Sequence, residues 1–485
     1  MGLEKLNPLI VNYLITQPNE VEWIEFKEND CEPQKLGEIL SGVANSANLH
    51  DRQFGYVIFG ISDKTKQIVG TKFDLKSRKV GNEELEHWLN QRMLPKAILD
   101  IFEVERNGFK LVIFKIAAPT DRPIDFSNIA YIRIGSITRN IKEFPDHERK
   151  IWQNIKNRNF EKQIALECVD TDEILNLLNY PYFFEITEQP LPENKKTIIK
   201  KLLESRMIIF HDGVYSITNL GGILFAKDLK KLGRLGRKAP RVIIYEGNDK
   251  TSTKVEQEGT RGYAKAFPAI IKFIKDKLPS NEIIKEAFRE EQKMYPEIAI
   301  RELIANALVH QDLFESGIAP MVEIYSDRIE ITNPGKPLVD IDRFIDHAPR
   351  SRNEDLASFM RQIKICEERG SGIDKVIRSV EMYQLPAPKF EANEQFTKVT
   401  LYAYKKLIKM DREDKIRACY QHCVLKYVSN DLMNNTSLRK RFNISEKNYS
   451  IASRIIADTL QSGLIKPSDP SSASKKFMSY VPNWV

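Results

Sequence analysis

A stripe of polar residues on one amphipathic helix constrains this chain more than any other feature. Residues 300–312 read IRELIANALVHQD, in which Glu302, Asn306 and His310 recur every four residues. This spacing places the three side chains along one face of a helix. A carboxylate that can activate water, one turn from an amide that can complete an octahedral Mg²⁺ shell, is what a helix-mounted ATP-Mg²⁺ site requires. A solvated helix face is the other interpretation of the same stripe.

The following segments add a base-binding and a phosphate-binding pattern. Residues 322–337, VEIYSDRIEITNPGKP, alternate apolar and polar side chains and predict a strand, a turn and a strand. Asp327 lies at the expected tip, where a carboxylate could accept a hydrogen bond from an adenine amino group, and residues 333–335 form a tight Asn-Pro-Gly turn. Gly370 and Gly372 then precede a second amphipathic helix, whose N-terminus can face phosphates.

In this order, the series resembles the divergent branch of GHKL (Bergerat-fold) ATP-binding domains that is loosely labelled RecG-like and often attached to predicted transcription regulators. The resemblance implies an α/β sandwich over residues 286–406, with ATP and Mg²⁺ (or Mn²⁺) as cofactors. The implied roles are Glu302 as general base, Asn306 as Mg²⁺ ligand, Asp327 at adenine, Gly370 and Gly372 at the phosphate lid, and further cofactor contacts at His310, Asn333 and Gly335. One departure is that the usual Asp-x-Gly-x-Gly reads Asp-Arg-Ile-Glu from Asp327. This departure supports an alternative in which the pocket is vestigial.

Composition indicates a multidomain protein of the cytoplasm. A chain of 485 residues suggests roughly three domains at ~150 residues each. The sequence contains no apolar run of membrane-spanning length and no secretory signal, so we expect no membrane partner. Five scattered cysteines, an odd number, favour a reducing compartment. The net charge of +7 permits a polyanionic partner without requiring one.

Residues 1–150 predict an α+β unit, because short strand-like runs alternate with helical periodicity. Its motif residues are Glu20, Glu25, Lys27, Asn45, Gly60, Asp63 and the run YIRIGS at 131–136. Together they resemble the Schlafen AlbA-like domain over essentially this whole segment. The resemblance implies nucleic-acid binding. In metal-dependent endoribonucleases of the wider Schlafen family, three carboxylates form the site, and by position these are Glu20, Glu25 and Asp63.

The three acids allow two interpretations. Converging carboxylates could hold divalent cations that orient water against a phosphodiester, while Lys27, Arg133 and Arg139 hold the strand. Alternatively, acids on an edge strand protect it from aggregation. Glu20 and Glu25 are five residues apart, so on one continuous strand they would face opposite sides.

The remaining segments predict helical modules. Residues 151–285 contain a charged helix and then a helix with two short strands, which is the outline of a winged-helix-like connecting segment leading into the ATP module. Residues 407–485 predict three helices and a basic hairpin, the order of a winged helix-turn-helix. The expected nucleic-acid contacts are Lys447, Asn448 and Arg454 on the recognition helix and Lys475 and Lys476 in the wing. A protein-contact role is the alternative.

These features predict a cytoplasmic protein that binds ATP and nucleic acid (DNA or RNA) and acts as a regulator or effector, in transcription control or anti-phage (antiviral) defence. The alternative is a Schlafen-like metal-dependent endoribonuclease gated by the ATP domain. A transcription factor with a vestigial pocket is the third interpretation. ATPase and nuclease activity both stay open. A homo-oligomer is implied by the GHKL resemblance, since such domains often dimerise on binding ATP.

Overall fold

The computed structural model describes residues 8–16, 21–62, 65–75, 77–211, 213–278, 280–285, 288–347, 350–366, 371–469 and 478–485. The chain divides into two compact units. The first unit comprises 1–159, 166–170 and 210–216, and the second comprises 160–165, 171–209 and 217–485. Both units mix helices and strands, so the predicted multidomain α+β fold is confirmed.

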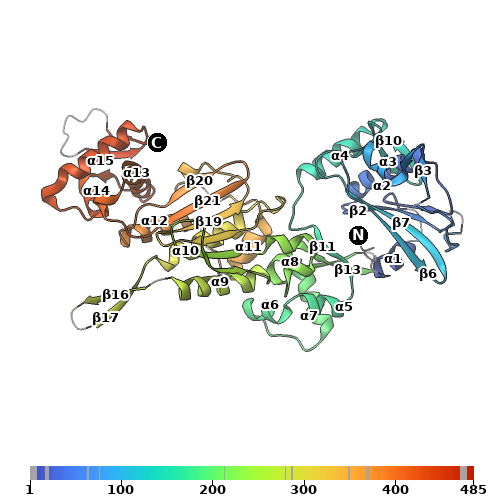
Figure 1. Ribbon diagram of the computed structural model, residues 1–485, viewed down its shortest axis with the longest axis horizontal. Helices are drawn as coiled ribbons and strands as arrows, with labels where there is room; N and C mark the ends of the chain where they lie inside the picture. Colours follow the sequence, from blue (N-terminus) through green and yellow to red (C-terminus); the bar gives the residue numbers. More distant parts are fainter. Residues whose placement is uncertain are drawn as a thin grey trace. The chain divides into compact units, whose positions relative to one another are not determined.

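The first unit contains two four-stranded sheets and a central helix, α2 (Figure 1). One sheet has the order β1 (Ile24–Lys27), β2 (Phe54–Phe59), β7 (Phe109–Ala117) and β6 (Leu99–Arg106). The other has the order β10 (Ile137–Asn140), β9 (Ile129–Ile134), β8 (Asp125–Phe126) and β5 (Met93–Leu94). The remaining elements are α1 (Pro8–Ile15), α2 (Pro33–Leu49), β3 (Lys79–Val80), β4 (Glu83–Glu84), α3 (Leu85–Arg92) and α4 (Pro145–Lys156).

Helix α2 is buried because it contacts both β2 and β9. Its apolar residues enter the core, and its small polar residues bind backbone. The Asn45 amide donates to the carbonyls of Ile124 and Tyr131 at 2.9 and 2.8 Å, and its Oδ1 accepts from the Ile124 N–H at 2.8 Å. A fully satisfied buried amide of this kind fixes the chain around it. Asn45 therefore holds the second sheet in place.

The chain segment from Ile164 to Phe225 is mainly helical. Its elements are β11 (Ile164–Val169), α5 (Thr171–Leu177), α6 (Tyr180–Ile186), α7 (Lys195–Glu204), β12 (Ile208–His211), β13 (Val214–Thr218) and α8 (Asn219–Phe225). Helix α7 is thus followed by two short strands, as in the outline expected from the sequence. Over the described residues, no helix is both long and apolar enough to cross a bilayer.

The second unit is built on a six-stranded sheet. Its order is β15 (Thr253–Glu258), β14 (Arg241–Tyr245), β18 (Met321–Ile324), β19 (Arg328–Pro334), β21 (Phe396–Tyr402) and β20 (Lys389–Ala392). Strands β14 and β18 are parallel, and β18, β19 and β21 are antiparallel neighbours. Other elements are α9 (Tyr263–Lys277), the hairpin β16 (Ser280–Lys285) and β17 (Phe288–Lys293), α10 (Glu297–His310), α11 (Glu354–Gln362) and α12 (Gly372–Met382). Helix α10 packs on β19 and between α9 and α12.

A C-terminal helical module, residues 411–485, closes the second unit. Its elements are α13 (Arg412–Val428), β22 (Met433–Asn434), α14 (Asn435–Arg441), the 3-10 turn η6 (Glu446–Asn448), α15 (Tyr449–Gln461), β23 (Ile465–Pro467) and β24 (Ser479–Pro482). The three short strands form one sheet. The sequence predicted Lys447 and Asn448 on the recognition helix. Helix α15 begins at Tyr449, so both residues lie in the turn before it. Lys475 and Lys476 lie outside the described residues.

Candidate functional site

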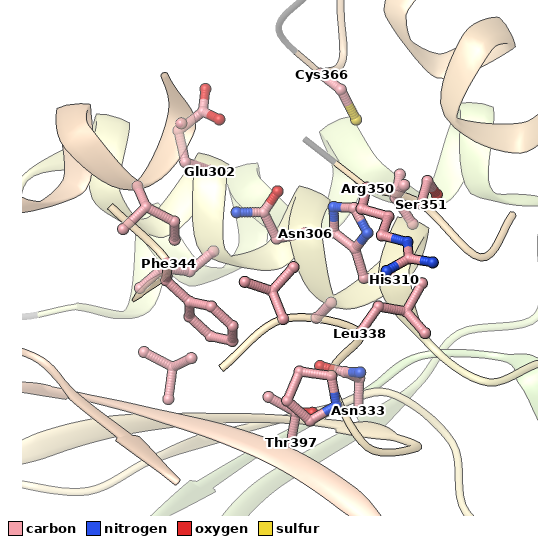
Figure 2. Close-up of a pocket in the computed structure, with 18 of the residues that line it drawn as sticks. Glu302, Asn306, His310, Asn333, Leu338, Phe344, Arg350, Ser351, Cys366 and Thr397 are labelled. Atoms are coloured by element: carbon pink, nitrogen blue, oxygen red, sulfur yellow. The ribbon is translucent and has the colours of Figure 1, made fainter. Parts of the chain in front are cut away.

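A cavity of about 290 Å³ lies in the second unit, between α10 and the strands β19 to β21 (Figure 2). Side chains from six elements and from residues 337–352 line it. The lining includes Glu302, Asn306, His310, Asn333, Phe344, Arg350, Arg352, Arg361, Gly372, Ile373, Phe390 and Thr397. The helical stripe expected from the sequence therefore lines one cavity.

Glu302 lies at the crowded end of this cavity, next to the start of α12. Glu302 is 8% exposed, and this burial raises the pKa of its carboxyl group. The positive charges of Lys375 and Arg301 lower that pKa by a smaller amount. A carbon atom added at Gly372 would lie 2.8 Å from Glu302 Oε2. Glycine at this position leaves room for the carboxylate beside the start of α12. A buried carboxyl group with a raised pKa suits proton transfer.

His310, at the last turn of α10, also lines the cavity. Desolvation by surrounding protein, with a smaller contribution from the charge of Arg352, lowers the pKa of its ring to about 4. The imidazole is therefore neutral near neutral pH. It can offer one donor and one acceptor to a ligand.

Asn333 brings a neutral amide to the cavity from the end of β19. It is 8% exposed, and its Nδ2 donates to the Pro334 carbonyl at 3.2 Å. Gly335 follows with φ +91, and its carbonyl accepts from Thr397 Oγ1 at 2.8 Å. This bond ties the Asn-Pro-Gly turn to β21. With its Nδ2 engaged, Asn333 presents Oδ1 as an acceptor.

Asp327 does not line the cavity, which corrects the expected adenine contact. It lies in the hairpin turn between β18 and β19, where its half-exposed carboxylate pairs with Arg328 Nη1 at 2.9 Å. The length of β19 separates this turn from Asn333 by roughly 20 Å at ~3.3 Å per residue. The polar group of β19 that lines the cavity is Asn333, at the opposite end of the strand from Asp327. Gly370 lies outside the described residues.

An arginine-rich segment that the sequence reasoning missed forms another wall. Arg350 and Arg352 line the cavity, as does Arg361 of α11. Asn353, which is 3% exposed, donates to the carbonyls of Val309 and Gln311, both at 2.8 Å. It thereby satisfies backbone acceptors at the end of α10 and fixes the segment there. The sequence signal was the run SRN directly before the acidic start of α11.

In the first unit, the buried acid on β1 is paired with cations. Glu25 is 5% exposed, and its Oε1 and Oε2 lie 2.6 Å from Lys27 Nζ and 2.5 Å from Arg133 Nη1. The Arg133 side chain is fully buried, so it does not face a nucleic-acid strand as expected. Arg139 on β10 is exposed.

The proposed three-carboxylate site falls partly outside the described residues, because Glu20 and Asp63 lie there. Across the part of the chain that the structure describes, no group of three or more His, Cys, Asp and Glu side chains could hold a metal ion. A carboxylate flanked by two cations has less negative potential to offer a divalent cation.

Two family models match the chain. The one described as "Schlafen, AlbA_2" matches residues 20–142, and the one described as "Putative ATP-dependent DNA helicase recG C-terminal" matches residues 317–401. The predicted fusion of these two domains is confirmed. The second match begins after α10, so Glu302 and Asn306 lie before it. Together the two domains support a protein that binds nucleic acid and ATP.

Other comparisons add little. No curated protein matches the chain. A crystal structure of a protein from Corynebacterium diphtheriae aligns with 98% of this chain and 96% of its own, at 15% identity and a TM-score of 0.43. A TM-score this low does not establish a shared fold.

Proposed function

We propose that this protein is a nucleic-acid-binding regulator that binds ATP-Mg²⁺ in the cavity beside α10, and that the nucleotide changes the state of its C-terminal helical module. The observation that carries the proposal is the common lining of one cavity. It joins a carboxylate and an amide of α10, an amide at the end of β19 and the glycine start of α12. These groups come from segments up to 70 residues apart in the chain, Glu302 to Gly372.

The donor set fits Mg²⁺. Mg²⁺ in nucleotide sites usually takes one or two oxygens from the protein and the rest from phosphates and water. The amide of Asn306 would hold the ion, with Glu302 one helical turn away. When bound, Mg²⁺ offsets the charge of the phosphates. Glu302, whose carboxyl pKa is raised by burial, would accept a proton from an attacking water.

The opposite part of the cavity suits a purine base. Phe344 and Phe390 supply apolar surface, and Asn333 supplies a neutral acceptor. One N–H of the Asn333 amide donates to Pro334, so the side chain keeps Oδ1 as an acceptor and its second N–H as a donor. The exocyclic amino group of adenine would donate to Oδ1.

The C-terminal helical module shares its core with the walls of the cavity. Ile345 and Ile377 belong to the same apolar cluster as residues of α13, α14 and α15, and the cavity-lining Ile373 and Phe390 pack against that cluster. Helix α12 runs about 14 Å from the cavity at Gly372 to Glu381. There Glu381 contacts His422 of α13 and Arg441 of α14. A ligand that moves α12 would therefore shift the module.

We propose a nucleic-acid surface in each unit. Arg454 on α15 and Lys447 in the turn before it are exposed, as is Arg139 on β10. The order of helices and short strands in the module is that of winged helices that read duplex DNA. This order favours transcription control as the setting. ATP-dependent self-association is part of the proposal through the GHKL resemblance.

The decisive experiment compares two variants by calorimetry with ATP and Mg²⁺. Asn306→Ala should abolish Mg²⁺-dependent binding, because it removes the amide oxygen that would ligate the ion. Asp327→Ala is the matched control and should bind as the wild type does, because this side chain lies in a hairpin turn outside the cavity. Binding that survives in Asn306→Ala would contradict the proposed site. The same protein should then be titrated with duplex DNA, single-stranded DNA and tRNA, with and without ATP.

A further inference from the structure

We infer that Arg350 is the polyphosphate-binding residue of the cavity, so that the site selects nucleoside triphosphates through its guanidinium group. This inference rests on the proposed function and specifies which part of the ligand the site recognises. It assigns the phosphates to an arginine-rich loop in addition to the glycine start of α12.

The charge of the cavity lining supports this assignment. Three guanidinium groups, Arg350, Arg352 and Arg361, face one carboxylate, Glu302, among the described lining residues. Burial favours the neutral form of that carboxyl group. No carboxylate within the described ranges pairs with Arg350, which is exposed to the cavity. A lining with this excess of positive charge suits a polyanion and disfavours an uncharged ligand.

Two nitrogens of the Arg352 guanidinium group contact the described residues, and the third makes no hydrogen bond to them. Its Nε lies 3.6 Å from Asp312 Oδ2, and its Nη2 donates to the Lys336 carbonyl at 3.0 Å. Its Nη1 is buried and makes no hydrogen bond to the described residues. Arg352 therefore anchors the segment that carries Arg350 to the turn after β19. A phosphate oxygen is the acceptor that guanidinium groups bind best, and Arg350 is the arginine of this segment that is exposed.

Glycine at position 335 leaves room for this buried nitrogen beside the turn. A carbon atom added there would lie 2.9 Å from Arg352 Nη1. In Figure 2, Arg350 lies with His310 and Asn306 on one side of the cavity, while Asn333 and Thr397 lie on the opposite side. The base-binding acceptor and the Arg350 guanidinium group thus lie on separate sides of the cavity, while Arg352 binds the turn that follows Asn333. A nucleotide that places its base at Asn333 would extend its phosphates toward Arg350.

The test uses the full chain and two probes, ATP with Mg²⁺ and adenosine. Arg350→Ala should weaken ATP binding about tenfold or more, the loss expected for one charge-assisted contact. Adenosine binding should not change, because adenosine has no phosphate. Arg350→Lys should recover part of the ATP affinity. Lys336→Ala is the control, since Lys336 is an exposed cation that pairs with Glu394 and does not line the cavity.

Each result decides between the two proposals. If Arg350→Ala binds ATP as tightly as the wild type, the arginine assignment is overturned while the nucleotide site stands. If ATP and adenosine weaken equally, Arg350 shapes the cavity and does not select phosphate, which also overturns it. If the wild type binds neither probe, the proposed function fails together with this inference.

Discussion

Substitution of Glu381 tests how the C-terminal helical module is held on the end of α12. The Glu381 carboxylate lies 3.0 Å from His422 Nδ1 and 3.3 Å from Arg441 Nε. The Arg441 side chain is only 2% exposed, and its Nη2 donates to the Leu385 carbonyl at 2.7 Å. Glu381→Gln keeps the volume and removes the charge. It should leave Arg441 buried without a compensating carboxylate.

The expected loss of stability is about 3 kcal/mol. Breaking a buried ion pair from one side usually costs roughly 3–5 kcal/mol. The lower end applies because Glu381 is 16% exposed and Arg441 retains its bond to Leu385. Since each ~1.4 kcal/mol is a factor of ten, amide hydrogen exchange in α13, α14 and α15 should accelerate by about a hundredfold. Exchange is the suitable measurement because it reports on this module separately from the rest of the chain.

Two further variants make the test specific. Glu446→Gln removes an exposed acid from the same module and should leave exchange unchanged. The pair Glu381→Leu with Arg441→Met should cost less than the sum of the two single changes, because no charge is then left buried. A Glu381→Gln protein with exchange like the wild type, or single changes that simply add, would refute the reasoning.

Two other predictions concern pH and nucleic acid. The pKa of the His310 ring is lowered from 6.5 to about 4, so the unfolded chain takes up a proton before the folded chain does. Stability should therefore fall as the pH drops from 6.5 to about 4. In denaturant titrations over this pH range His310→Asn should show a smaller fall, and an unchanged fall would assign the effect to other groups. Arg454→Ala and Lys447→Ala should each weaken duplex DNA binding and reduce the dependence of log K on log salt by about one; a variant with an unchanged salt slope would exclude that side chain from the phosphate contacts.

Local patterns predicted those parts of the second unit that depend on neighbouring residues. The four-residue spacing from Glu302 to His310 placed one helical face correctly, and alternation placed β18 and β19. Asp327 was proposed at the adenine side from its residue type, whereas the structure places it outside the cavity. The packing of β19 against α10 determines which end of the strand reaches the cavity. The sequence of the strand alone does not predict this packing. The Asn-Pro-Gly turn was recognised but was not given priority.

Pairings between distant segments could not be predicted. Glu25 is neutralised by Arg133, which is far away in sequence on the second sheet of the first unit. A carboxylate read alone suggests a metal ligand, whereas the same group between two cations suggests a structural ion pair. Arg350 and Arg352 were missed for a similar reason. They reach the cavity only because Asn353 binds the end of α10 and holds their segment there.

The shared core also determines how control by nucleotide can be studied. Removing the residues after Met410 would seem the direct way to ask what the C-terminal helical module contributes. Ile345, Ile377 and Ala387 pack into the same apolar cluster as α13, α14 and α15, so truncation would expose them to water. A truncated protein would then lose nucleotide binding through damage to the walls of the cavity. Surface changes such as Arg454→Ala leave that cluster intact, and so only they can separate nucleic-acid binding by the module from its structural support of the cavity.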